Sequence, residues 1–145
     1  MIELTPLARP YAKALFSSAL ESENLDGMAN DLKTMATASK TEEIKGTIED
    51  PVLSRQEVVE ILTKLFDESV GETSKKLLSI LAENKRLNLL EPIHSIYQEL
   101  LEKHKEQNSI EVFVAAIPSD EAKEDIENKL RSSYGKDANI FFSKD

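Results

Sequence analysis

The sequence predicts a mainly helical protein, with a six-helix N-terminal bundle followed by a small α/β domain. Apolar residues recur every three or four positions up to about residue 106, which is the spacing of amphipathic helices. Near residue 109 the period changes to two, which is the spacing of a strand. We therefore expect two domains, a six-helix bundle over residues 1–106 and a partial strand–helix–strand domain over residues 107–145.

Helix-starting and helix-ending residues delimit the first half of the bundle. Thr5 followed by Pro6 is a favourable start, because a capping side chain precedes a proline at the first helical position. Pro10 either kinks this helix or marks where its regular part begins. Asp50 should end the third helix, because a residue before proline disfavours helical backbone. The expected helices span about residues 5–23, 25–39 and 41–48.

The second half of the bundle has equally clear signals. Ser54 and Glu57 have the spacing of a capping box at the start of the fourth helix. Gly71 separates that helix from a fifth, expected over about residues 72–83. A sixth begins near Asn88, with Glu91 three residues further on. Connections are short, so neighbouring helices should pack antiparallel.

The C-terminal domain reads as strand, helix and strand. Ile110, Val112 and Val114 alternate with residues of the opposite face. A helix then runs from Pro118–Asp120 to about Tyr134, and residues 138–142 form a second strand, which predicts a parallel pair. A parallel sheet normally has more strands and cover on both faces, so we expect this domain to be incomplete.

Composition excludes several classes of function. The chain has 27 acidic residues against 18 Lys and Arg, a net charge of −9, which argues against binding the phosphate backbone of a nucleic acid. No cysteine is present, which excludes disulfides and thiolate chemistry and fits a reducing compartment. The longest apolar run covers Val112 to Ile117, whereas a membrane span needs about 20 residues.

The sequence also contains no evident catalytic or cofactor-binding constellation. His94 and His104 are ten residues apart on one expected helix and point about 280° apart, so they cannot share a metal ion. The four glycines are isolated, which leaves no phosphate-binding loop. Adjacent carboxylates lie at helix starts or on polar faces, where solvation explains them. We expect no enzyme activity, metal, cofactor or small-molecule substrate.

Two helices have more apolar surface than a one-sided helix needs. On the first, apolar or small residues cover an arc of about 240°, against the roughly 100° stripe of an ordinary surface helix. On the fifth, the arc is about 200°. Either these helices lie at the centre of the bundle, or one edge of each arc lines a groove for a partner helix. Tyr11 favours the groove, because its hydroxyl group prefers water.

Two segments resemble signatures of a known family. Ala8 to Phe16, with the sequence ARPYAKALF, is similar to the opening signature of ATP synthase delta subunits. Ala82 to Leu90, with the sequence AENKRLNLL, is similar to the loop between helices 5 and 6 of the same family. The mitochondrial counterpart is the oligomycin-sensitivity-conferral protein. The resemblance covers the whole chain and implies a six-helix domain followed by a smaller α/β domain.

The resemblance implies a stator connector in the peripheral stalk of a bacterial F-type ATP synthase, the enzyme that couples proton transport to ATP synthesis. The N-terminal domain should bind the N-terminal helix of an alpha subunit of the catalytic head, in a groove between helices 1 and 5. The C-terminal domain should hold the stalk of b subunits. Family members usually continue beyond Asp145, so stalk binding has less support. The implied groove residues are Leu7, Tyr11, Ala14, Ser18, Leu77 and Ile80.

The loop between helices 5 and 6 is expected to act as a hinge. Asn84 tolerates the left-handed backbone of a helix end, and Asn88 should cap helix 6. Arg86 should bind carbonyl groups at the end of helix 5. The expected location is peripheral, at the cytoplasmic face of the inner membrane. The alternative function is a free-standing helical adaptor or regulator that binds another amphipathic helix.

Overall fold

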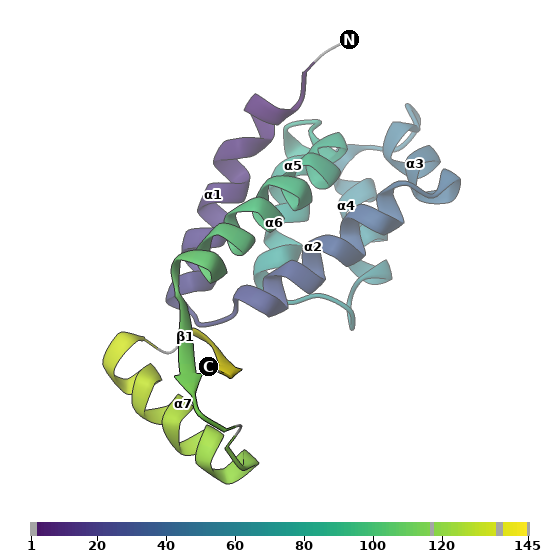
Figure 1. Cartoon of the computed structure of the whole chain (residues 1–145). Helices are drawn as coiled ribbons and strands as arrows, with labels where there is room; N and C mark the ends of the chain where they lie inside the picture. Colours follow the sequence, from purple (N-terminus) through teal and green to yellow (C-terminus); the bar gives the residue numbers. More distant parts are fainter. Residues whose placement is uncertain (1–2, 117, 136–137, 145) are drawn as a thin grey trace. The chain divides into compact units, whose positions relative to one another are not determined.

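The computed structural model describes residues 3–116, 118–135 and 138–144, and these form seven α-helices, one 3₁₀ turn and two strands (Figure 1). The chain divides into two compact units, residues 1–100 and 101–145, which we describe separately. This division and the domain boundary expected from the sequence both lie within helix α6 (Leu90–Gln107). The predicted fold class, mainly helical with a small parallel sheet near the C-terminus, is confirmed.

The first unit is a helical bundle in which α4 packs against α5, and α2 contacts α1, α3 and α5. Its core consists of aliphatic side chains, two methionines, one phenylalanine and one tyrosine, and burying each large apolar side chain contributes about 1.5–3 kcal/mol. The remaining elements of this unit are α1 (Thr5–Glu21), α2 (Leu25–Ser39), α3 (Glu42–Glu49), α4 (Arg55–Leu65), α5 (Glu72–Glu83) and the 3₁₀ turn η1 (Leu87–Leu89).

Two of the three predicted N-terminal caps need correction. At α4 the capping box is present, with the Glu57 amide donating to Ser54 Oγ at 3.1 Å and the Ser54 amide to Glu57 Oε1 at 3.2 Å. Thr5, by contrast, is already helical, and its amide donates to Glu3 Oε1 at 3.0 Å. Asn88 lies inside the turn η1 and does not cap α6, which begins at Leu90. Sequence spacing did not reveal the extra 3₁₀ turn.

Helices α1 and α5 end in the same way, with one residue in the left-handed conformation. Glu23 follows α1 at φ 55° and Lys85 follows α5 at φ 56°. The amide of the next residue donates to the carbonyl five positions before it, from Asn24 to Ala19 O at 2.8 Å and from Arg86 to Leu81 O at 2.7 Å. This is the Schellman arrangement, which normally places glycine at the left-handed position. Its occupation by charged residues stores backbone strain at both helix ends.

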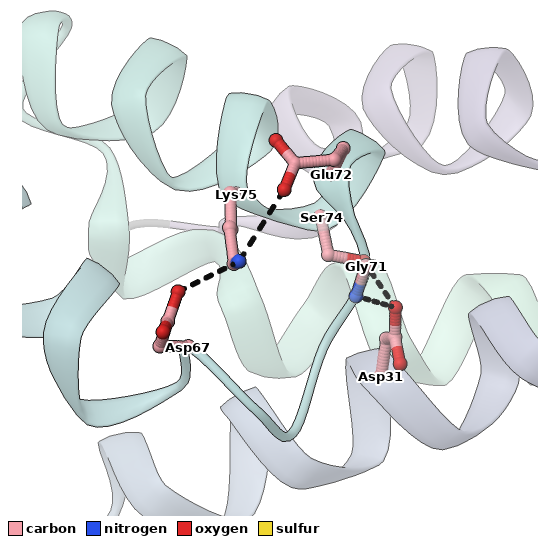
Figure 2. Close-up of polar contacts among 6 residues, drawn as sticks. All are labelled: Asp31, Asp67, Gly71, Glu72, Ser74 and Lys75. Atoms are coloured by element: carbon pink, nitrogen blue, oxygen red, sulfur yellow. Dashed lines mark hydrogen bonds and ion pairs between the residues drawn. The ribbon is translucent and has the colours of Figure 1, made fainter.

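The N-terminus of α5 is closed by a carboxylate from another helix (Figure 2). Gly71 precedes α5 and has no side chain with which to cap it. Asp31 of α2 takes over that role, because its Oδ2 accepts hydrogen bonds from the Gly71 amide at 3.0 Å and from Ser74 Oγ at 2.7 Å. On the surface nearby, Lys75 Nζ lies 3.0 Å from Asp67 and 3.4 Å from Glu72. The cap therefore ties α2 to α5.

Tyr97 of α6 connects three helices of the first unit. Its side chain is fully buried, and its hydroxyl group donates to the Leu25 carbonyl of α2 at 2.7 Å. Its ring meets Phe16 of α1 edge to face, with centroids 5.8 Å apart. Burial raises the pKa of the Tyr97 phenol from 10.0 to about 12, because the ionised form would lose its hydration.

The second unit contains a parallel pair of strands, β1 (Ser109–Val114) and β2 (Asn139–Lys144), joined through α7 (Asp120–Tyr134). The two strands are parallel, as predicted from the sequence, with Ser109 opposite Asn139 at one end and Val114 opposite Lys144 at the other. Lys123 of α7 lies 5.6 Å from the ring centroid of Phe142, so α7 covers that face of the sheet. On the opposite face, Phe113 is 68% exposed and Phe141 is 44% exposed.

Candidate functional site

Helix α1 has two neighbouring stripes of small and apolar residues with opposite environments. The first stripe is buried in the bundle and consists of Ala8, Ala12, Leu15 and Ala19. The second stripe, which we call the outer stripe, consists of Leu7, Tyr11, Ala14 and Ser18. Leu7 is 40% exposed, Ala14 and Ser18 are exposed, and Tyr11 is half-buried. The wide apolar arc predicted from the sequence therefore divides into a core edge and a surface edge.

Helix α5 shows the same division with fewer residues on the surface. Its buried face consists of Ser74, Leu77, Leu78, Leu81 and Ala82. Ile80 lies outside this face and is 46% exposed. Leu77, which the resemblance assigned to the groove, is only 5% exposed, because it packs with the core residues. The structure thus leaves Ile80 on the surface and puts Leu77 in the core.

The chemistry of these surfaces is that of contact rather than catalysis. Apolar and small side chains make up the outer stripe, and the exposed cations Arg9 and Lys13 lie on another face of α1. Among the described residues, no His, Asp and Glu side chains gather in a group that could hold a metal ion. An exposed stripe of apolar and small side chains is suited to binding the apolar face of an amphipathic helix.

The predicted hinge is held by different groups from those expected. Asn84 has φ −94°, and the next residue, Lys85, adopts the left-handed conformation instead. The Asn84 side chain donates to the Ile80 carbonyl at 2.9 Å. The carbonyl at the end of α5, that of Glu83, accepts from Arg55 Nη1 at 2.6 Å. Arg86 contributes its backbone amide to the helix end, whereas the expectation was that its side chain would bind carbonyl groups there.

The role of Arg55 was missed by sequence reasoning. Arg55 begins α4, 28 residues before its partner Glu83, and no local pattern connects the two. Beside this bond, a cavity of about 540 Å³ lies between the loop before α4 and the end of α5. Leu53, Val58 and Leu87 are among the apolar residues that line it. Residues of the second signature segment therefore fix the joint between α5 and α6 through packing and backbone contacts.

A family model described as the ATP synthase delta (OSCP) subunit matches residues 7–145 of the chain. The chain belongs to this family. Members are non-catalytic subunits of ATP synthase, so the expectation of a non-catalytic protein connected with ATP synthesis and proton transport is confirmed by membership.

Curated relatives agree with the family match. The chain is 32% identical over 145 residues to the ATP synthase subunit delta of Vibrio alginolyticus, which covers all of this chain and 81% of that protein. It is 33% identical over 142 residues to the subunit delta of Acinetobacter baylyi, covering 97% of this chain and 79% of that protein. The match to the subunit delta of Marinobacter nauticus is 40% over 98 residues, 68% of this chain and 55% of that protein.

The delta-family chain shows no membrane-spanning element in the part that the structure describes. No helix there combines the length and the apolar character that crossing a bilayer requires.

Proposed function

We propose that this chain is the stator connector of an F-type ATP synthase and that its first unit binds the N-terminal helix of an alpha subunit of the catalytic head. Membership of the delta family supports the stator role. The observation that carries the contact is the outer stripe of α1, where Leu7 is 40% exposed beside a fully buried stripe of the same helix. Exposed apolar surface of this kind marks interaction sites.

The outer stripe and Ile80 of α5 together form the proposed docking surface. Ala14 and Ser18 have small side chains, so the backbone of a partner helix can come close to α1. Leu7 and Ile80 supply the larger apolar contacts. Tyr11 is half-buried, and its hydroxyl group would stay in contact with water at the rim of the docking surface. A few such anchors carry most of the affinity in helix-in-groove complexes.

The mechanism is mechanical. The rotor turns inside the head, and the head must be prevented from turning with it. A connector that binds the head at one unit and the b-subunit stalk at the other supplies this resistance without any bond chemistry. We propose the stalk contact for the second unit, residues 101–145, and a peripheral position at the cytoplasmic face of the membrane. Family membership is the support for both.

The test is the substitution Ala14→Glu, measured by calorimetric titration of the whole chain with a peptide of the alpha N-terminal helix. We expect loss of binding with unchanged helix content, because the new carboxylate would be buried against an apolar partner. Thr37→Glu is the matched control, since Thr37 is an exposed helical residue on α2. Equal affinity of the Ala14 variant and the wild-type chain would rule out this docking surface.

A further inference from the structure

His94 lies on α6 between two polar contacts that join α6 to α2. One turn before it, Glu91 forms an ion pair with Lys40 at the end of α2, with Nζ and Oε1 2.8 Å apart. One turn after it, the Tyr97 hydroxyl group donates to the Leu25 carbonyl at the start of α2 at 2.7 Å. The two helices are therefore antiparallel here, and His94 occupies the middle of their contact.

Within the part of the chain that the structure describes, the His94 imidazole has one ring nitrogen that is buried without a hydrogen-bond partner. Its Nε2 atom is buried, and it has no hydrogen bond to any residue among 3–116, 118–135 and 138–144. Buried polar atoms in folded proteins almost always have a partner, because an unpaired one loses its hydration without compensation. A neutral ring tolerates this position far better than a charged ring, which has two N–H groups to satisfy.

The charges around His94 are predominantly positive. Lys33 and Lys40 of α2 and Glu91 of α6 are the charged groups in the described structure that act on it. Burial lowers the pKa of His94 most, and the two lysines lower it further, while Glu91 opposes them. Glu91 and Lys40 are paired with each other, so their opposite effects on His94 partly cancel and the repulsion from Lys33 is left.

We propose that His94 is an acid-sensitive element of the α2–α6 contact, which is stable with the neutral ring and loosens when the ring takes up a proton. Protonation would add a cation with an unpaired N–H group to a site that already feels the positive charges of Lys33 and Lys40. The ion pair and the Tyr97 hydrogen bond on either side would then have to hold the helices against that repulsion. This inference does not depend on the binding of the alpha subunit.

The sign of the pH effect follows from linkage. In the unfolded chain, His94 takes up a proton at its ordinary pKa, whereas in the folded chain it does so only at lower pH. The contribution of the neutral ring to stability is therefore complete above the ordinary histidine pKa. It is lost progressively as the pH falls below that value, and the loss is complete once the pH passes the lower pKa of the folded state.

The first measurement is a titration of the two histidines of the whole chain by proton–carbon NMR. We expect His94 to titrate below the ordinary histidine pKa. We also expect Lys33→Gln to raise the pKa of His94 while the ring is retained. A His94 that titrates at or above the ordinary value, or one whose pKa does not change in the Lys33 variant, would overturn the proposal.

The second measurement compares urea unfolding at pH 7.5 and pH 5.5 for the wild-type chain and two variants. We expect His94→Gln to lose less of its urea midpoint on acidification than the wild-type chain, because glutamine does not titrate. Ser95→Gln, at an exposed position next to His94 on the same helix, is the matched control and should lose as much as the wild-type chain. An equal loss in the His94→Gln variant and the wild-type chain would contradict the proposal.

Discussion

Asp31 of α2 accepts a hydrogen bond from the hydroxyl group of Ser74 in α5 at 2.7 Å, and the same oxygen accepts the Gly71 amide at 3.0 Å (Figure 2). Ser74 is fully buried, so this bond satisfies a buried hydroxyl group of the helical core. The carboxylate also lies at the positive end of the α5 dipole. One side chain thus performs a capping role that Gly71 cannot perform and fastens two helices that are 40 residues apart in the sequence.

The first prediction concerns this cap. Asp31→Ala leaves a buried hydroxyl group and a helix-start amide without their acceptor, which should lower the free energy of unfolding by about 1–3 kcal/mol. Urea unfolding of the whole chain measures the loss. Asp67→Ala removes an exposed carboxylate from the nearby ion pair with Lys75 and should cost clearly less, because water screens an exposed pair. Equal losses in the two variants would show that Asp31 contributes no more than a surface charge.

The second prediction concerns the strained helix ends. Lys85→Gly should raise the free energy of unfolding by about 0.5–1 kcal/mol, because glycine adopts positive φ without the steric cost that a side chain incurs. Glu23→Gly should act in the same direction. Thermal unfolding detects both changes. Asn84→Gly is the control: at φ −94° glycine relieves no steric cost, and the change also removes the side-chain hydrogen bond to the Ile80 carbonyl, so it should be destabilising.

The third prediction separates the core face of α5 from its surface. Leu77→Ala should lower the free energy of unfolding by about 2–5 kcal/mol, because it opens a cavity next to the fully buried Leu78. Ile80→Ala should change stability much less, since its side chain is 46% exposed. In titrations with the alpha peptide, the order should be reversed, with Ile80→Ala weakening binding. An Ile80 variant with unchanged affinity would remove α5 from the proposed docking surface.

Local chemistry accounts for the parts of the fold that the sequence predicted. The Ser54–Glu57 box, the bounds of α5 and the strand–helix–strand order all depend on residues that are close in the sequence. The errors concern long-range relations or competition between neighbours. Periodicity could not show that Arg55 binds the Glu83 carbonyl or that Asp31 caps α5. The prediction placed Asn84 in the left-handed conformation because asparagine tolerates it, but Lys85 is the residue that adopts it.

The candidate site was predictable to a similar extent. The sequence showed that apolar residues cover a wider arc on helices α1 and α5 than a one-sided helix needs. In the structure, part of each arc is buried in the core and part lies on the surface. On α1, the buried stripe and the outer stripe are neighbours on the helix surface, so together they account for the wide arc. On α5, helical periodicity alone could not show that Leu77 is buried in the core whereas Ile80 is exposed. That distinction depends on how the neighbouring helices pack around α5.

The open sheet of the second unit also has consequences for the behaviour of the chain at high concentration. Among the described residues, each strand has a partner on one side only, so β1 and β2 both present an edge of unpaired amides and carbonyls. The exposed rings of Phe113 and Phe141 lie on the same open face. Edges of this kind are templates for pairing with like strands, which makes this sheet the place where self-association would begin. The overall charge of −9 opposes such association through mutual repulsion, and this opposition weakens as salt screens the charges.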